Sequence, residues 1–411
     1  MAEQKNAVMS WIDDRFPLTE TYEYHMSKYW TPKNFNFWYY FGVLSFVMLI
    51  LQLVTGIFLT MNYKPDGASA FTSVEYIMRD VDYGWLIRYM HSTGASFFFI
   101  AVYLHMFRGL MYGSYQKPRE LIWVFGMLIY VALMAEAFMG YLLPWGQMSY
   151  WGAQVILSLF NTIPWIGPAL TEWVRGDFIV SDITLNRFFA FHVIAVPLIL
   201  VALVFLHIVA LHHVGSNNPD GIDIKKNKNS EGVPLDGIPF HPYYTVKDTF
   251  GTGVFLIVFF AVVFFAPEMG GYFLEHANFI PADPLKTPEH IAPVWYFTPF
   301  YAMLRATPSM MGSAFPGVMV MGAAIVVLFF LPWIDRGKVR SIRYRCKAFK
   351  INLFLLALAF VVLGYYGMQA PTDLGTFLSR LFTFVYFGYF IALFIISKDE
   401  KTKPVPERVT H

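Results

Sequence analysis

Long apolar runs alternate with polar connections along most of the chain. Eight runs of membrane-spanning length follow one another, over residues 37–61, 83–112, 121–143, 184–213, 247–267, 311–333, 350–368 and 377–397. About 20 helical residues cross the hydrocarbon core of a bilayer, and lipid accepts only helices or closed barrels as spanning structures. Because the runs lack the alternation of a strand, they predict an all-α polytopic membrane protein with eight transmembrane helices.

The polar connections divide the predicted fold into four parts. Residues 1–36 are an N-terminal surface segment with a short amphipathic helix near 8–16, and residues 37–216 hold the first four helices. Residues 217–246 are a cytoplasmic linker, of which 217–240 has the composition of a flexible segment. Residues 247–411 hold the last four helices and a cytoplasmic tail. Two other connections are long enough to carry function, with short surface helices expected in the first. They cover residues 144–183 and 268–310.

Basic residues give the predicted orientation. Most lie in connections on the side that also holds the N-terminus, and they include Lys117, Arg119, Lys225, Arg340 and Lys398. Cytoplasmic connections carry the excess of lysine and arginine in membrane proteins. With eight spans, both termini are therefore expected in the cytoplasm.

Composition agrees with a membrane protein and excludes several classes. The 411 residues are 56% hydrophobic and 14% charged, where roughly a quarter charged is usual for soluble domains. The single cysteine excludes a disulfide framework and a thiolate metal site. A net charge of +2 argues against nucleic acid as a partner. The N-terminus lacks a signal-peptide pattern, so the first apolar helix is expected to be retained.

Four histidines within two of the apolar runs are the main chemical signal. His91 and His105 are 14 residues apart, and His192 and His207 are 15 apart. On an α-helix these spacings separate the two histidines by about 21 and 22.5 Å along the axis and place them on nearly the same face. The two runs are separated by one span and run in the same direction. His91 is therefore expected opposite His192 at one depth, and His105 opposite His207 at another.

Two facing imidazoles at each depth fit the axial ligands of a six-coordinate haem, which transfers electrons. Zinc would require a third or fourth ligand. The competing interpretation is that these histidines bond to neighbouring helices or relay protons, as in a haem-free transporter.

Glycines and arginines repeat the histidine spacing. Glycine pairs 14 residues apart occur on the first and third runs and leave room for a flat macrocycle; they are Gly42 with Gly56 and Gly126 with Gly140. Ordinary small-residue helix packing is the alternative. Arg88 and Arg108 each lie three residues outside a histidine, where they suit haem propionates or simply snorkel to the interface.

Several stretches resemble the cytochrome b family, the haem-carrying subunit of quinol–cytochrome c oxidoreductase, or complex III. They are GWLIRYMHSTGAS, RGLMYGSY, MGYLLPWGQMSYWGAQVI, RFFAFH, GSNNPDG and FHPYYTVKD. The resemblance implies two non-covalent b-type haems: an outer, low-potential one on His91 and His192, and an inner, high-potential one on His105 and His207. It implies that Arg88 and Arg108 contact the haem propionates and that the four glycines make room for the rings. Gln52 and Ser114 join the implied cofactor-binding set.

The same resemblance implies two quinone sites. The outer quinol site, where quinol is oxidised, would comprise Met139, Gly140, Gly152, Pro293, Trp295, Tyr296 and Tyr301. The inner quinone site, where quinone is reduced, would comprise His212, Ser216, Lys247 and Asp248. Tyr296, Tyr301, His212 and Asp248 are the implied catalytic residues, although His213 competes with His212. From the residues alone, both groups also read as interfacial packing.

Two departures from the family pattern stand out. The outer-site signature normally has a glutamate after its proline, but this chain has Val294 there. We hypothesise that Glu289 replaces it as proton acceptor. The 15-residue histidine spacing exceeds the mitochondrial 14, and a kink near Pro197 is expected to absorb the extra residue. Together the departures resemble beta- or gamma-proteobacterial forms.

The implied partners are a Rieske-type iron–sulfur protein, a membrane-bound c-type cytochrome subunit, quinone, the lipid membrane and a second copy of the chain. The implied location is the bacterial inner membrane. The chain lacks the CxxCH of a c-type haem and a cysteine pair for a cluster, so partners would supply both. The rival function is a di-haem membrane anchor of a dehydrogenase or hydrogenase, which would require only four or five spans and no large outer loop.

Overall fold

Membrane-length helices dominate the computed structural model, which describes residues 6–410. Within that range, seven helical segments are long and apolar enough to span a membrane: residues 37–60, 84–112, 120–142, 182–214, 240–265, 347–368 and 373–396. In the eighth predicted span, α13 (Phe315–Phe329) has 15 residues and α14 (Leu331–Ile334) follows it. The predicted all-α membrane fold is thus confirmed, with one short span.

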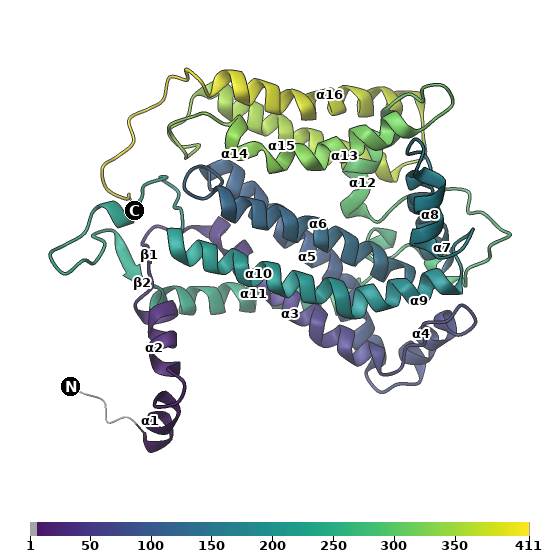
Figure 1. Cartoon of the computed structure of the whole chain (residues 1–411), viewed down its shortest axis with the longest axis horizontal. Coiled ribbons are helices and arrows are strands. Elements are labelled where there is room, and N and C mark those ends of the chain that lie inside the picture. Colours follow the sequence, from purple (N-terminus) through teal and green to yellow (C-terminus); the bar gives the residue numbers. More distant parts are fainter. Residues whose placement is uncertain (1–5, 411) are drawn as a thin grey trace.

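Four helices form the N-terminal bundle. They are α3 (Tyr40–Thr60), α5 (Gly84–Tyr112), α6 (Glu120–Leu142) and α10 (Val196–Val214), with α3 packed along α5 and α6 along α10 (Figure 1). Of the seven spans, α5 is the most enclosed. A helix that is apolar on all sides suits such a buried position.

A π-helical turn precedes α10 and carries His192. The chain enters through α9 (Asp182–Ala190), passes through this turn (η3, Phe191–Ala195) and continues as α10. A π turn adds one residue to a helical turn and often occurs at functional sites. It therefore accommodates the 15-residue histidine spacing. The sequence placed this adjustment near Pro197, and the π turn ends just before that residue.

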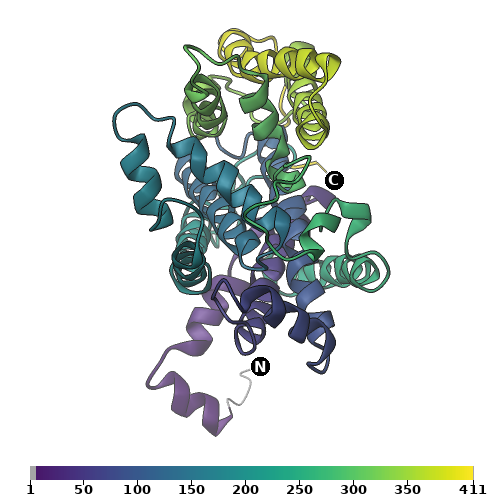
Figure 2. The same cartoon turned by 90° about the vertical axis from the view of Figure 1, so that its right-hand side faces the viewer.

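Surface helices cover one end of the bundle (Figure 2). They are α4 (Ala70–Arg79), α7 (Gln147–Phe160) and α8 (Gly167–Arg175). The last two are the short helices predicted in the 144–183 connection, and they pack on each other. The 268–310 loop is fastened to the start of α7, because Asn278 Oδ1 accepts a hydrogen bond of 2.9 Å from the Ser149 amide. This attachment holds both long connections together.

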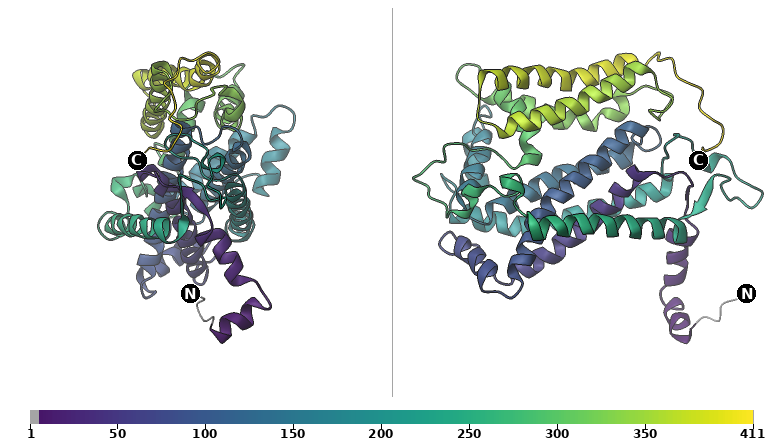
Figure 3. Two further views of the ribbon diagram at one scale, coloured as in Figure 1. Left: turned by 90° about the vertical axis from the view of Figure 1, so that its left-hand side faces the viewer. Right: turned by 180° about the vertical axis from the view of Figure 1, so that it is seen from behind.

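The later helices separate into two groups (Figure 3). Helix α11 (Thr245–Phe265) packs on α3 and α5, so it joins the N-terminal bundle. The second group contains α12 (Thr298–Ala306), α13, α15 (Lys347–Met368) and α16 (Asp373–Ile396). The four-part division of the chain remains a prediction.

The opposite end of the molecule gathers both ends of the chain (Figure 1). The short helices α1 (Ala7–Asp13) and α2 (Leu18–Tyr22) lie there, where the sequence predicts one amphipathic helix. Strand β1 (Trp30–Pro32) pairs antiparallel with β2 (Gly237–Pro239), with Thr31 opposite Ile238. The remaining short turns are Glu23–Ser27, Phe37–Tyr39, Ile224–Lys226, Phe240–Tyr244, Met269–Gly271, His276–Phe279 and Trp295–Phe297.

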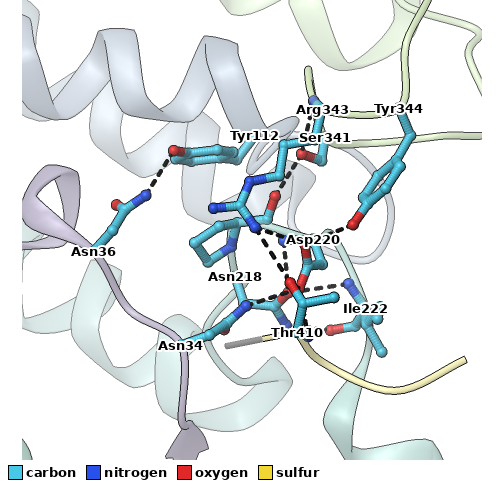
Figure 4. Close-up of polar contacts among 11 residues, drawn as sticks. Asn34, Asn36, Tyr112, Asn218, Asp220, Ile222, Ser341, Arg343, Tyr344 and Thr410 are labelled. Carbon is cyan, nitrogen blue, oxygen red and sulfur yellow. Dashed lines mark hydrogen bonds and ion pairs between the residues drawn. The ribbon is translucent and has the colours of Figure 1, made fainter. Parts of the chain in front are cut away.

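Asp220 fastens the predicted linker to three distant segments (Figure 4). Its Oδ2 accepts hydrogen bonds from Asn34 Nδ2 and the Thr410 amide, both 2.9 Å. Its Oδ1 accepts from Arg343 Nη1 and the Tyr344 hydroxyl, both 2.8 Å. Burial opposes the charge on Asp220, but these hydrogen bonds prevail and hold its pKa below the ordinary value. This part of the linker is therefore anchored in the fold.

Candidate functional site

The first histidine pair lies toward the end with the surface helices. His91 of α5 and His192 of the π turn face each other, with ring centroids 6.1 Å apart and planes at 87°. Nδ1 of His192 is 2.9 Å from the Glu136 carbonyl oxygen, which accepts a hydrogen bond. Nδ1 of His91 is 2.9 Å from Thr55 Oγ1, whose own proton goes to the Leu51 carbonyl. Both rings therefore donate from Nδ1 and keep the Nε2 lone pair for a metal.

The second pair lies deeper toward the end that holds the chain termini. His105 of α5 and His207 of α10 have ring centroids 6.3 Å apart and planes at 63°. Each pair therefore brings two imidazoles, which are common metal ligands, close together at one depth. The structure thus places His91 with His192 and His105 with His207, on the same two helices at two depths.

Each of the four glycines lies against one of these imidazoles. A Cβ added at Gly42 or Gly56 would lie 3.3 Å from Cε1 of His105 or His91, respectively. At Gly126 it would lie 3.5 Å from Cε1 of His207. Gly140 is the tightest position, because its added Cβ would lie only 2.4 Å from Cε1 of His192. The glycines therefore make room first for the histidine rings.

The residues around the two pairs fit a haem at each level. Among residues 6–410, no group of three or more His, Cys, Asp or Glu side chains could hold a metal ion, so the protein offers two imidazoles at each depth. A haem supplies the other ligands of a six-coordinate iron. Arg108 Nε is buried without a hydrogen-bond partner in the described structure, as expected for a guanidinium that faces a bound carboxylate. Arg88 forms no ion pair within the described residues. Gln52 Nε2 donates a hydrogen bond to the His91 carbonyl.

A cavity of about 500 Å³ joins the inner histidine pair to the predicted inner quinone site. This volume lies in the usual range of small-molecule pockets. His105 and His207 line it, and so do Gly42, Gly126, Arg108 and Ser114. The same cavity reaches all four residues of the inner quinone site, which are His212, Ser216, Lys247 and Asp248.

The N-terminal segment covers His212, which the sequence did not indicate. Tyr29 stacks on the His212 ring with centroids 4.1 Å apart and planes at 9°. The Tyr29 hydroxyl is 3.3 Å from Ser216 Oγ, and His25 Nδ1 is 3.1 Å from His212 Nδ1. The aromatic character of residues 22–30 was the available signal. No such contact is recorded for the neighbouring His213 ring in the described structure.

Residues of the predicted outer quinol site lie where the 268–310 loop meets α5, α6 and α7. Tyr296 is buried and stacks on Phe99, with centroids 3.9 Å apart. The Trp295 indole donates to Ser96 Oγ at 3.0 Å. Gly152 of α7 faces the ring of Tyr141, with 3.6 Å between an added Cβ and Tyr141 Cε1. The loop is thus docked on α5, the helix that carries His91.

The other members of the outer set are more dispersed. Met139 is partly buried and packs against two hydrophobic clusters of the protein. Pro293 is partly buried, and the Tyr301 hydroxyl is 3.4 Å from the Ile291 carbonyl. The side chain of Glu289 is exposed. Sequence reasoning missed Tyr141 and Glu275, which share a hydrogen bond of 2.6 Å in this region.

Comparisons with known families and proteins cover nearly the whole chain. Residues 26–215 match the family model described as cytochrome b/b6/petB, and residues 281–387 match cytochrome b (C-terminal)/b6/petD. The chain is 62% identical to cytochrome b of Allochromatium vinosum over 414 aligned residues, which cover 100% of both chains. It is 50% identical to cytochrome b of Rickettsia bellii, with 98% of this chain and 97% of that one covered.

A solved structure has the same fold. A chain of a structure described as hyperthermophilic respiratory complex III aligns with a TM-score of 0.86 and 39% identity. The alignment covers 95% of this chain and 98% of the other. Because the alignment covers 95% of the chain, the similarity includes the C-terminal helices as well as the four-histidine bundle.

Proposed function

Because this chain belongs to the cytochrome b family, we propose that it is the di-haem quinone-binding subunit of a bacterial respiratory complex III. The observation that carries the proposal is the pair of facing imidazoles at each of two depths on the same two helices. A di-haem anchor of a dehydrogenase or hydrogenase would explain the histidines, but it would not require the docked outer loop.

The histidines would hold the two haems, which supply one-electron transfer between the membrane faces when bound. His91 and His192 would ligate the outer haem, and His105 and His207 the inner one. Backbone and side-chain contacts at Nδ1 of the outer pair fix the ring orientation, which second-shell partners commonly do at metal sites. Arg88 and Arg108 would pair with the propionates, with Gln52 and Ser114 in the surrounding shell.

Quinol oxidation at the outer face would use the outer quinol site, with Tyr296 and Tyr301 near the substrate. Quinone reduction at the cytoplasmic face would use the cavity beside the inner histidine pair. Reduction requires a proton for each carbonyl oxygen, and His212 and Asp248 line the cavity as groups able to relay them. Lys247 and Ser216 would orient the ring.

The orientation of the chain makes the reaction contribute to the proton gradient. With both termini in the cytoplasm of a multi-pass inner-membrane protein, protons would leave at the outer face and enter at the inner face. An electron moving inward works against the membrane potential, at about 2.3 kcal/mol per 100 mV for a full crossing. The inner haem must therefore bind the electron more tightly than the outer one.

Other subunits would complete the enzyme. A Rieske-type iron–sulfur protein would take one electron from quinol, and a membrane-bound c-type cytochrome would pass it on. The chain is also proposed to form a homodimer.

The test uses the purified complex with its partner subunits. We expect two b-type haems per chain and quinol-dependent reduction of cytochrome c. His192→Leu and His207→Leu should each remove one haem, whereas His276→Leu, which changes an exposed histidine of the 268–310 loop, should retain both. A wild-type complex that contains one haem or none would overturn the proposal.

A further inference from the structure

Val294, which stands where the family pattern has a glutamate, lies in an apolar environment. Val294 is only 4% exposed and packs in the main hydrophobic core beside Tyr296. A buried valine cannot accept a proton from quinol. If the outer quinol site has an acidic acceptor, it must come from another position.

Glu275 supplies a carboxylate from the same loop. Its Oε2 accepts a hydrogen bond of 2.6 Å from the Tyr141 hydroxyl. Tyr141 follows Gly140, the glycine that lies against the His192 ring. The ring of Tyr141 faces Gly152. Glu275 also lies close enough to Tyr296 to interact with it electrostatically. The Glu275 carboxylate thus lies beside Tyr296 of the outer quinol site and is bonded to Tyr141, the residue that links Gly140 in sequence with Gly152 in space.

Glu289 has a different environment in the same loop. Its side chain is exposed, whereas Glu275 is partly buried. In the described structure no hydrogen bond or ion pair is recorded for the Glu289 carboxylate. The geometry therefore favours Glu275 over Glu289 as the replacement.

We propose that Glu275 accepts a proton from quinol at the outer site and that Tyr141 positions the Glu275 carboxylate. This inference rests on the proposed function. In this step one O–H bond of the quinol breaks, its proton binds a carboxylate oxygen of Glu275 and one electron leaves to the iron–sulfur partner. Glu275 is the catalytic residue, and Tyr141 is a positioning residue.

The ionisation of Glu275 suits this role. Burial raises the pKa of the Glu275 carboxyl above its ordinary value, and the hydrogen bond from Tyr141 partly opposes that rise. The groups that face it are the phenols of Tyr141 from α6 and Tyr296 from the 295–297 turn. A raised pKa brings a carboxylate closer to the operating pH, where proton acceptance is most efficient.

The first variant is Glu275→Gln in the complete complex. Quinol oxidation should fall by about 100-fold, as expected when a general base is removed, and the acid limb of its pH profile should disappear. The matched control is Glu268→Gln, an acid of the same loop whose carboxylate lies 3.8 Å from Nδ1 of the exposed His276, and it should retain the wild-type rate. Equal losses in both variants would overturn the inference, as would an unchanged rate and pH profile in Glu275→Gln.

Restoring the family glutamate tests the same point from the other side. Val294→Glu added to Glu275→Gln should recover most of the lost rate. A double variant that keeps both haem spectra yet remains as slow as Glu275→Gln would overturn the idea that the two positions serve one role.

Two further measurements do not depend on turnover. Infrared difference spectra recorded on quinol binding should show a carboxyl C=O band that is absent in Glu275→Gln but present in Glu289→Gln. The reverse assignment would overturn the inference. Tyr141→Phe removes the hydrogen bond that lowers the Glu275 pKa, so the acid limb should move to higher pH. An unmoved limb would contradict the positioning role.

Failure of this inference is distinguishable from failure of the proposed function. A wild-type complex that binds two haems and oxidises quinol, with Glu289 rather than Glu275 required, would overturn only the assignment of the acceptor. A wild-type complex that does not oxidise quinol would overturn the proposed function itself.

Discussion

Replacing Gly140 by alanine should remove the outer haem while leaving the inner one in place. The new Cβ would lie 2.4 Å from Cε1 and 2.8 Å from Nδ1 of His192, whereas ordinary van der Waals contact begins at 3.4 Å. The His192 ring would have to move by about 1 Å. Metal–ligand distances tolerate deviations of only about 0.2 Å, so the ligand bond could not survive the shift.

Neither the ring nor the glycine has an easy way to relieve this overlap. Nδ1 of His192 is held at 2.9 Å by the carbonyl oxygen of Glu136, which lies on the same helix, α6, as Gly140. Moving the ring away from residue 140 would therefore strain this hydrogen bond. The matched control is Gly126→Ala, whose Cβ would lie 3.5 Å from the His207 ring, within ordinary contact. We therefore expect Gly126→Ala to bind both haems.

The assay is haem content per chain together with reduced-minus-oxidised spectra of the purified complex. Gly140→Ala should retain about half of the wild-type haem and lose the low-potential component, and Gly126→Ala should match the wild type. Full haem content with unchanged spectra in Gly140→Ala would refute the argument from the close contact.

Two further predictions concern the end of the molecule that holds the chain termini. The Asp335 carboxylate accepts two hydrogen bonds from the fully buried Arg345 guanidinium, at 2.6 and 2.9 Å. Asp335→Asn would leave the buried charge of Arg345 uncompensated, so it should destabilise the protein by about 3–5 kcal/mol. An unchanged thermal unfolding midpoint would contradict this. Hydrogen bonds from Arg408 lower the pKa of Asp236 to about 2, so its contribution to stability is present above the ordinary carboxyl pKa of about 4 and is lost as the pH falls toward 2. Asp236→Asn should therefore flatten the stability curve over that acidic range, and an unaltered acid slope in thermal melts would count against the assignment.

The helices and the pairing of the histidines were accessible from sequence because both follow from periodicity. A span is a long apolar run, and two histidines 14 or 15 residues apart must share a helix face. Helix direction then determines which histidine faces which. The sequence located the adjustment near Pro197, but it did not show that the adjustment is a π turn over Phe191–Ala195, because a π turn leaves no distinct apolar pattern.

Contacts between segments that are distant along the chain could not be predicted from the sequence. Tyr29 stacks on His212 across more than 180 residues, and Glu275 bonds to Tyr141 across 134 residues. Neither pair has a spacing rule, because loop conformation determines both contacts. The same limit affected the predicted linker, whose composition suggests flexibility but whose Asp220 is buried among hydrogen-bond donors.

A redox titration of the complex, followed at the b-type haem bands, distinguishes two stacked haems from one or none. Two midpoints are expected, with the higher one lost in His207→Leu and the lower one lost in His192→Leu. A single haem in the wild type, or loss of the two components in the reverse order, would contradict it.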